Sequence, residues 1–487
     1  MRAKNVLLAL IFVLALAARL YFSLQSGTFT LDSYFDYRQV QHIRETGLPA
    51  FDDKLSYGGR EFLFLPAFHY ILAFFSFFMP FEAALTVMPC VFSASVVFIV
   101  YVFVKKITKN EAISLFSSLA SAFIPIHFVS NISSVSSLSL QIPLLFAGLY
   151  CFLMSNRNAY MILFVVLTFF LTLVEGSSIL LILAFILYLS LGKISGFSVE
   201  KRSIELILFY MFIVLWIILI FFKNAFLAHG FSVIWQNIPF VIRNQYFVRT
   251  TIFETVLSIG LLPIVSGAFA CYLYVLRIKD KTFYLLLSLA ISVLVLIWSR
   301  LITPIIGLSI LGIVLVIFSG ALLNLFLKYI RKTKFSKLKN LSAAAFAVVF
   351  ILNLLTLSIL FSLNPVTLSQ QDLDALRFMA AQEKGAILAP VELGHAITAV
   401  ADQPNIADTS FLLADNAEQR VSDIRTVYTT PFALTAIKIM DKYNAKYLYV
   451  PKNTEIQYID ERCFEEVYSG QVKVYRIICE VKEADKK

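Results

Sequence analysis

The chain has 487 residues, of which 59% are hydrophobic and only 15% are charged, and this composition excludes a soluble globular protein of that length. The net charge of +10 does not indicate a nucleic-acid partner, because the basic residues gather in short segments between apolar runs, as in the cytoplasmic loops of membrane proteins. We therefore predict a polytopic α-helical protein of the cell membrane, surrounded by lipid and without a nucleic-acid partner.

The apolar runs predict the membrane spans. About 20 apolar residues in a helix cross the hydrocarbon core of a bilayer. Basic clusters follow every second run, which predicts a cytoplasmic N-terminus and an extracytoplasmic C-terminal part. A further run, residues 62–79, would invert this alternation, and we expect it to lie at the outer leaflet. The runs taken as spans are residues 5–24, 83–104, 112–130, 140–154, 159–174, 177–191, 203–222, 255–276, 282–299, 303–327 and 341–362.

Polar segments define the outer side and a second domain. The expected outer loops are residues 25–61, 130–139 and 223–254. Composition changes near residue 364, which predicts a transmembrane domain over 1–363 and a soluble extracytoplasmic α/β domain over 364–487. The expected elements of the second domain are strands at 385–390 and 446–450, an amphipathic helix at 431–443 and a hairpin turn at Ser469-Gly470.

Cys463 and Cys479 flank the predicted hairpin. In an oxidising compartment they can form a disulfide, and the alternative is a pair of buried thiols. The sequence leaves both open.

Asp32, Asp36 and Arg38 form the first dense polar cluster of the chain. They lie in Leu31-Asp32-Ser33-Tyr34-Phe35-Asp36-Tyr37-Arg38, shortly after the first apolar run. One interpretation is a helix cap with solvated charges at the membrane surface. The other is a binding site, because residues at i and i+4 share one face of a helix.

Three segments carry a resemblance to a known family. They are Leu31–Arg38, Thr251-Ile252-Phe253-Glu254 at the end of the middle outer loop, and Trp298-Ser299-Arg300-Leu301 at the end of a span. In this order, and with an exported C-terminal domain, they resemble the catalytic subunit of oligosaccharyltransferases of the archaeal and bacterial single-subunit type. The resemblance implies a GT-C fold with about 11–13 transmembrane helices.

The resemblance also implies residue roles. Asp32 would bind a divalent metal, Mg or Mn, and activate the acceptor. Apart from the resemblance, Asp36 could serve as a second metal ligand, because it shares a helix face with Asp32. Glu254 would organise the acceptor side of the site. Arg300 would contact the phosphate of the lipid-linked donor, although an arginine there can also simply snorkel to the interface.

Further residues complete the predicted site. Arg38 and Glu392 are predicted to bind substrate. His42 or Glu175 could supply another metal ligand, although a structural or solvated role is the simpler interpretation of both. The same simple interpretation applies to His69, which lies in the outer apolar run, and to His127 near the outer end of a span.

Two segments depart from the family pattern. Ser137 and Ser139 stand where the family carries Asp-x-Asp or Asp-x-Glu, and a hydroxyl is a poor ligand for a hard dication. Pro390-Val391-Glu392-Leu393-Gly394 stands where the family has Trp-Trp-Asp-Tyr-Gly. The metal site is therefore expected to be incomplete, and the usual recognition of the Asn-x-Ser/Thr sequon does not carry over.

The resemblance thus predicts a glycosyltransferase that moves a glycan from a polyprenyl phosphate or diphosphate donor to protein asparagine at the extracytoplasmic face. One alternative is a GT-C transferase with a different acceptor, such as a lipid or a glycan. Another is a non-catalytic paralogue that binds the lipid-linked glycan. A transporter fits less well, because the spans carry few charges.

Overall fold

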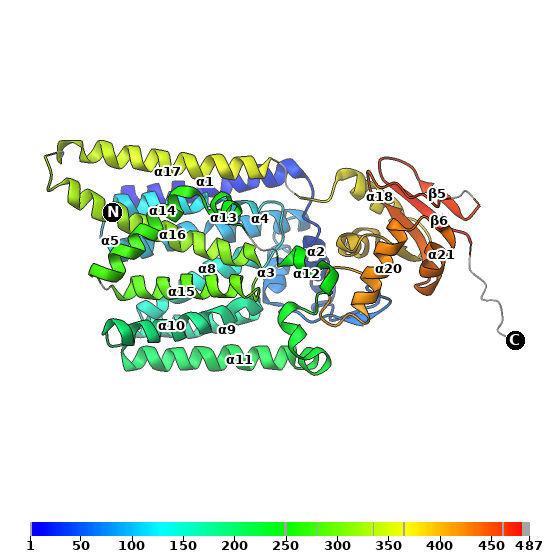
Figure 1. Cartoon of the computed structure of the whole chain (residues 1–487), viewed down its shortest axis with the longest axis horizontal. Coiled ribbons are helices and arrows are strands. Elements are labelled where there is room, and N and C mark those ends of the chain that lie inside the picture. Colours follow the sequence, from blue (N-terminus) through cyan, green and yellow to red (C-terminus); the bar gives the residue numbers. More distant parts are fainter. Residues whose placement is uncertain are drawn as a thin grey trace.

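The structure is a computed structural model that describes residues 2–247, 251–278, 280–334, 336–363, 366–459 and 462–479. A bundle of long helices fills one end of the elongated molecule, and a smaller part that contains a β-sheet fills the other (Figure 1). The N-terminus lies at the end of the bundle far from the sheet. The connection between α16 (Pro304–Ile330) and α17 (Lys339–Ser362) lies at the same far end.

The apolar runs form the helices of the bundle. Leucine, isoleucine, valine and phenylalanine dominate them, so each helix can face either lipid or other helices. Besides α16 and α17, the bundle contains α1 (Arg2–Ser26), α4 (Phe81–Ala94), α5 (Val96–Thr108), α6 (Glu111–Ala122), α7 (Pro125–Val129), α8 (Leu138–Leu153), α9 (Asn158–Val174), α10 (Leu180–Ser195), α11 (Lys201–His229), α13 (Ile252–Ile259), α14 (Leu261–Leu273) and α15 (Lys281–Trp298).

By length and hydropathy, 7 helical stretches among the described residues are able to cross a membrane, or up to 8 if the bent pair α13–α14 counts as one span. These numbers are lower than the predicted number of spans. The predicted runs at 112–130, 140–154 and 159–174 are helical, but α6, α8 and α9 have only 12, 16 and 17 residues. An extended Ile124 followed by Pro125 interrupts the first of these runs.

The bend between α13 and α14 has a local cause at Gly260. Its φ of +98° belongs to the region that residues with a side chain rarely adopt. A Cβ atom at this position would also lie 2.8 Å from Leu354 Cδ2 of α17. The two helices therefore meet at 97°.

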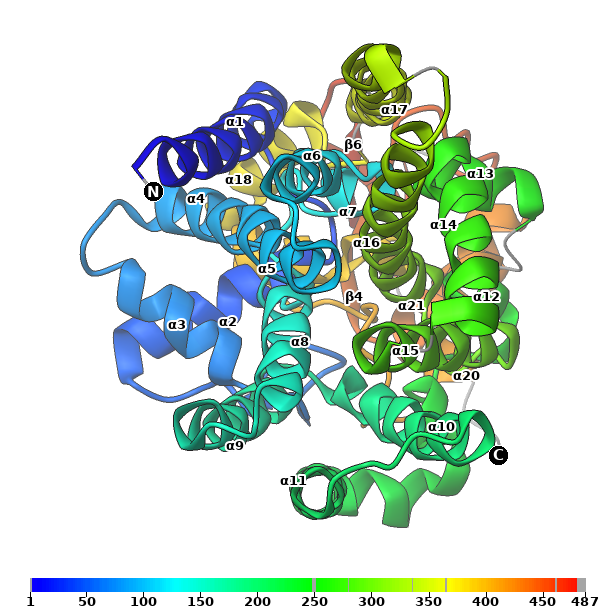
Figure 2. The ribbon, with the colours of Figure 1, turned by 90° about the vertical axis from the view of Figure 1, so that its left-hand side faces the viewer.

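Helix α16 is the inner helix of the bundle. In its most apolar window 78% of the residues are buried, against 17% for α1 and for α17. The view along the bundle shows α16 between α5 and α14, with α1, α9 and α11 at the rim (Figure 2). The helices at the rim expose apolar side chains that can contact lipid, while α16 packs mainly against other helices.

Short elements connect the bundle to the sheet-containing part. The expected outer-leaflet run at 62–79 contains α3, whose 9 residues span only about 14 Å and cannot cross a bilayer. This agrees with the expectation that the run does not cross. The other short elements here are α2 (Ser33–Thr46), β1 (Asp52–Asp53), β2 (Arg60–Glu61), α3 (Ala67–Phe75), a 3-10 turn η1 (Gly176–Ile179), a second 3-10 turn η2 (Gly230–Trp235) and α12 (Phe240–Tyr246).

The C-terminal part is an α/β unit, as predicted. Its sheet has the order β3-β4-β6-β5, in which β3 and β4 are parallel and the other neighbours are antiparallel. Both faces of β4 are buried: Tyr447 and Tyr449 pack toward α18, while Leu448 and Val450 pack toward α20 and α21. The elements are α18 (Gln370–Ala380), β3 (Ala386–Leu388), η5 (Val391–Leu393), α19 (Gly394–Ala396), α20 (Ala417–Thr429), α21 (Ala433–Lys442), β4 (Ala445–Val450), β5 (Phe464–Tyr468) and β6 (Lys473–Ile477).

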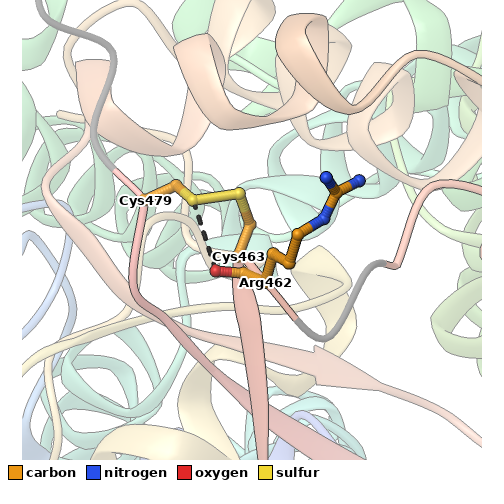
Figure 3. Close-up of a disulfide and its surroundings, with 3 residues drawn as sticks. All are labelled: Arg462, Cys463 and Cys479. Atoms are coloured by element: carbon orange, nitrogen blue, oxygen red, sulfur yellow. Dashed lines mark hydrogen bonds between the residues drawn. A yellow bond between two sulfur atoms is a disulfide. The ribbon is translucent and has the colours of Figure 1, made fainter.

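A disulfide joins Cys463 and Cys479, which resolves the alternative that the sequence left open. Their Cα atoms are 4.8 Å apart, and the Sγ atom of Cys479 lies 3.6 Å from the carbonyl oxygen of Arg462 (Figure 3). The bond joins the start of β5 to the end of β6. It therefore fixes the two open ends of the hairpin at the edge of the sheet.

Candidate active site

Asp32 lies at the start of α2, but its side chain does not cap the helix. No side-chain capping hydrogen bond is formed, and Asp32 Oδ1 instead accepts a hydrogen bond of 2.9 Å from the Thr409 hydroxyl. Thr409 belongs to the C-terminal part, and Asp32 is exposed. The acid therefore stands at the junction of the two parts of the molecule, where a large substrate can reach it.

Asp36 contacts α3 rather than the C-terminal part. Its Oδ1 lies 2.7 Å from His69 Nε2 of α3. Burial raises the pKa of Asp36, the contact with His69 opposes this shift, and the nearby Asp32 carboxylate adds to it. The two acids of the predicted pair thus occupy different environments, one exposed and one buried.

Glu175 supplies a second acid near Asp36. It lies in the short turn between α9 and η1, where its Oε2 accepts a hydrogen bond from the Ser137 hydroxyl. Burial raises the pKa of Glu175, the Ser137 hydrogen bond opposes this shift, and the Asp36 carboxylate adds to it. Ser137 stands where the family carries an acid. The Glu175 carboxylate, in the turn after α9, therefore lies beside that position.

Except for Asp32, these groups line one cavity of about 730 Å³. Asp36, His69, Glu175 and Thr409 are at its polar end. Ile186 and Leu215 line it and are 43% and 49% exposed, so the cavity borders the lipid-facing surface. Its apolar walls come mainly from α10, α11 and α16 and include Ile182, Leu183, Ile186, Leu215, Ile218 and Ile306.

A buried ion pair holds the first outer loop on the C-terminal part. Arg60 Nη2 donates to Asp408 Oδ1 at 2.7 Å, and both side chains are almost fully buried. The Arg60 guanidinium also lies over the rings of Tyr57 and Phe62, 4.4 Å and 4.3 Å from their centroids. Burial alone would raise the pKa of Asp408, but His395 and Arg60 bring it below its ordinary value. This pair positions Thr409 and hence its contact with Asp32.

Packing at Gly394 strengthens the same junction. A Cβ at Gly394 would lie 2.2 Å from the carbonyl oxygen of Ala407, so only glycine allows the two segments to approach this closely. Asn405 bridges them, because its Nδ2 donates to the Gly394 carbonyl at 3.0 Å and to Asp408 Oδ2 at 3.1 Å. The Gly shared with the family pattern thus has a packing role.

Two predicted site residues are engaged in local structure. Arg38 forms a two-pronged ion pair with buried Asp53, with Nη2 2.8 Å from Oδ1. Glu254 forms a capping box with Thr251 at the start of α13, with hydrogen bonds of 2.8 Å and 3.1 Å. Neither is among the described residues that line the cavity. Their predicted contacts with substrate remain predictions.

Arg300 and Glu392 lie nearer to the site. Arg300 has φ +57° in the turn before α16, and the residues that follow it, Leu301 to Thr303, line the cavity. Its guanidinium donates to Asn244 Oδ1 at 3.2 Å. Glu392 is exposed. Burial of the Tyr246 side chain raises the pKa of Tyr246, and the nearby Asp32 and Glu392 carboxylates raise it further. Tyr246 and these two acids therefore border the same outer surface.

The described residues do not by themselves compose a metal centre. No three His, Cys, Asp or Glu side chains among them gather closely enough to hold a metal ion. Asp36 is bonded to His69, and Asp32 to Thr409. His42, the other predicted reserve ligand, bonds to the carbonyl of Leu48 at 2.8 Å, within its own turn. The predicted Mg or Mn site therefore stays a prediction.

Comparisons with known proteins agree on the fold. No family model matches the sequence, and no curated protein matches it. The oligosaccharyltransferase AglB of Archaeoglobus fulgidus, in complex with an inhibitory peptide and a dolichol-phosphate, has a TM-score of 0.70 at 15% identity, covering 91% of this chain and 69% of that one. ArnT from Cupriavidus metallidurans bound to undecaprenyl phosphate has a TM-score of 0.58 at 12% identity, covering 96% of this chain and 97% of that one. The chain therefore has the GT-C fold of membrane glycosyltransferases, as predicted.

The structure also brings into the site residues that were not among the main predicted site residues. His69 pairs with Asp36, Glu175 approaches Ser137, and Thr409 meets Asp32. A histidine inside an apolar run was the available signal for His69, because such a residue needs a polar partner. The contact of Thr409 with Asp32 depends on the docking of the C-terminal part, which no local sequence pattern shows.

Proposed function

We propose that this protein is a membrane glycosyltransferase, a divergent member of the oligosaccharyltransferase catalytic-subunit family. It would transfer a sugar or glycan from a polyprenyl phosphate or diphosphate carrier to an acceptor at the outer face of the membrane. The observation that carries the proposal is the cavity, which joins a polar end with two acids and a histidine to a long apolar wall. A substrate that fits it has a polar head and an apolar tail.

A polyprenyl-linked sugar has this shape. Its isoprenoid chain would lie against Ile182, Leu215 and Ile218. This contact would bury apolar surface of the isoprenoid and of the cavity wall. Its phosphate would lie near Arg300, next to the cavity-lining residues Leu301 to Thr303. The solved AglB and ArnT complexes contain dolichol-phosphate and undecaprenyl phosphate, which supports a donor of the same class here.

The reaction is displacement at the anomeric carbon. The acceptor nucleophile forms a bond to that carbon, the bond from the carbon to the phosphate oxygen breaks, and the polyprenyl phosphate or diphosphate leaves with the electron pair. The resemblance implies inversion. Asp32 would orient the acceptor and receive its proton, because this carboxylate is exposed and held by Thr409. A divalent metal, if bound, would stabilise the charge on the leaving phosphate.

Protein asparagine is the acceptor that the resemblance implies. A different acceptor, such as a lipid or a glycan, is the second candidate, and one observation favours it. In the segment that replaces Trp-Trp-Asp-Tyr-Gly, Val391 and Leu393 are buried and Gly394 packs against Ala407. This segment offers only Glu392 to a substrate, so it lacks the aromatic pair of the family.

The proposal places the C-terminal part and the polar end of the cavity outside the cell. The disulfide supports this orientation, since such bonds persist mainly in oxidising compartments. The basic connections support it too, because the α16–α17 connection with Lys332, Lys334 and Lys337 lies at the opposite end of the molecule. The N-terminus would then be cytoplasmic.

The test is transfer by the purified protein. A polyprenyl-linked glycan pool and an Asn-x-Thr peptide are supplied with Mn or Mg, and again with a chelator. We expect glycopeptide with the wild type and a loss of roughly 10²–10⁴-fold with Asp32→Ala. Asp52→Ala, an exposed acid of the same loop, is the matched control. Donor turnover without glycopeptide would move the acceptor to the second candidate. Absence of any donor turnover, or full activity of Asp32→Ala, would contradict the proposal.

A further inference from the structure

One wall of the polar end of the cavity is a built cluster of hydrogen-bonding groups. Ser137, Glu175 and Ser177 all line the cavity. Glu175 accepts one hydrogen bond from the Ser137 hydroxyl and one of 3.2 Å from the backbone N–H of Gly176. A carboxylate has about four lone-pair sites. Glu175 can therefore accept further hydrogen bonds from a ligand in the cavity.

A hydrogen bond from α8 positions Ser177. Gln141 Nε2 of α8 donates a hydrogen bond to the Ser177 hydroxyl oxygen, so the hydroxyl hydrogen remains available for another acceptor. Gln141 is only 1% exposed, and its Oε1 has no partner within the described part of the chain. The cluster thus has spare donors as well as spare acceptors.

His69 adds a buried polar atom without a partner. The side chain lines the cavity and is 4% exposed. Its Nε2 bonds to Asp36, whereas its Nδ1 has no hydrogen-bond partner among the described residues. The rings of Phe35 and Phe64 lie beside it, and the Phe64 centroid is 5.0 Å from that of the imidazole. Buried polar atoms are normally satisfied, so this nitrogen points to a polar ligand.

We infer that Ser137, Glu175, Ser177 and His69 form a subsite for the hydroxyl groups of the sugar that the donor lipid carries. This inference rests on the proposed function and assigns these residues to the glycosyl group of the donor. Sugar hydroxyls both donate and accept hydrogen bonds, as this mixed set requires. The phosphate only accepts them, and the Glu175 carboxylate would repel it. An isoprenoid would leave the remaining donor and acceptor positions of these groups without partners.

The position of the cluster agrees with this assignment. Ile179 and Leu180 line the same cavity only a few residues after Ser177. A sugar in the subsite would therefore lie beside the start of the apolar wall, as a sugar next to the lipid phosphate must. A serine at position 137 is also compatible with Glu175, because its hydroxyl donates a hydrogen bond to that carboxylate. An aspartate at 137 would place two carboxylates in contact.

Binding of paired lipids to the full-length protein in detergent tests the subsite. One probe is a polyprenyl phosphate without sugar, and the others are the same lipid carrying glucose, mannose or N-acetylglucosamine. We expect at least one sugar to increase the affinity of the wild type. Glu175→Gln and Ser177→Ala should each reduce that gain about 3–10-fold and leave the affinity for the bare lipid phosphate unchanged. Glu200→Gln, an exposed acid beyond the other end of α10, is the matched control.

The outcomes separate this inference from the proposed function. Equal losses for the bare and the sugar-bearing lipids, or no loss in either variant, would overturn the subsite. So would a wild type that binds the bare lipid phosphate but gains nothing from any sugar, and in that case the lipid-binding part of the proposed function stands. A wild type that binds none of the lipids would overturn both. If Glu175→Gln does not fold, Ser177→Ala decides alone.

Discussion

The first outer loop (25–61) and the middle outer loop (223–254, described to residue 247 and again from 251) use their polar residues differently. The first loop contains two ion pairs with a buried carboxylate, Arg38–Asp53 and Arg60–Asp408. In the middle loop, the polar contacts are single hydrogen bonds. Some are local, as in the Thr251–Glu254 capping box, and others reach the C-terminal part, where Asn237 Nδ2 donates to the Phe411 carbonyl at 3.3 Å. Apolar side chains of this loop are exposed, with Phe231 at 82% and Phe240 at 71%.

The two outer loops therefore differ in how they contact the rest of the molecule. The first loop is fixed to the C-terminal part, so Asp32 and Thr409 keep one geometry. The middle loop contributes Val233, Ile234 and Phe247 to the cavity and turns other apolar side chains outward. Outward-facing phenylalanines at the membrane surface favour contact with lipid headgroups and acyl chains. The middle loop thus supplies part of the cavity wall and an apolar outer surface, while the first loop carries Asp32 at the contact with Thr409.

Removing the buried ion pair should have the largest effect. Arg60→Ala leaves Asp408 buried and without its cation, and we expect the free energy of unfolding to fall by about 3–5 kcal/mol. Thermal unfolding in detergent, followed by near-ultraviolet circular dichroism, measures the change. Lys384→Ala breaks an ion pair with Asp402 in the same part of the molecule that is 58% and 73% exposed, and should change little. Similar melting temperatures for both variants would show that the first loop is not fixed by this pair.

Arg300 should have an intermediate effect, on donor affinity. If its guanidinium contacts the donor phosphate, Arg300→Ala loses a charge-assisted hydrogen bond and weakens binding of polyprenyl phosphate about 10–100-fold. Arg202→Ala is a matched control, because Arg202 also donates to an asparagine side chain, Asn158, but lies in the first turn of α11 and does not line the cavity. Donor titrations of both variants make the comparison. Unchanged lipid affinity in Arg300→Ala would leave this arginine as an interfacial anchor.

Much of the fold could be predicted from sequence because its causes are local. Apolar runs form helices wherever they occur in the bundle. The strand at 386–388 falls inside its predicted segment, and the strand at 445–450 begins one residue before the predicted segment 446–450. Fewer helices than predicted are long and apolar enough to cross a membrane by themselves, in part because the break at Ile124–Pro125 limits α6 to 12 residues. The disulfide could only be left open, since cysteine spacing does not determine pairing.

The candidate site was harder to predict, because its contacts join residues far apart in the chain. Asp32 and Asp36 were identified together, yet one meets Thr409, 377 residues away, and the other meets His69. Glu175 was noted only as a reserve ligand, and its approach to Ser137 depends on how α8 packs against α9. Sequence reasoning finds the chemical groups, and tertiary packing decides which of them share a cavity.

Glu254 should have the smallest effect, and it tests the middle loop most sharply. Glu254→Ala removes half of the capping box at α13 and should lower the free energy of unfolding by about 1 kcal/mol. Glu254→Gln keeps the cap, because glutamine also serves in this motif, and removes only the charge. If Glu254 organises the acceptor, both variants raise the KM for the acceptor, whereas a residue that is only a cap changes stability in the alanine variant alone. Thermal unfolding and acceptor titrations on the two variants therefore distinguish a middle loop that binds the acceptor from one in which Glu254 only caps α13.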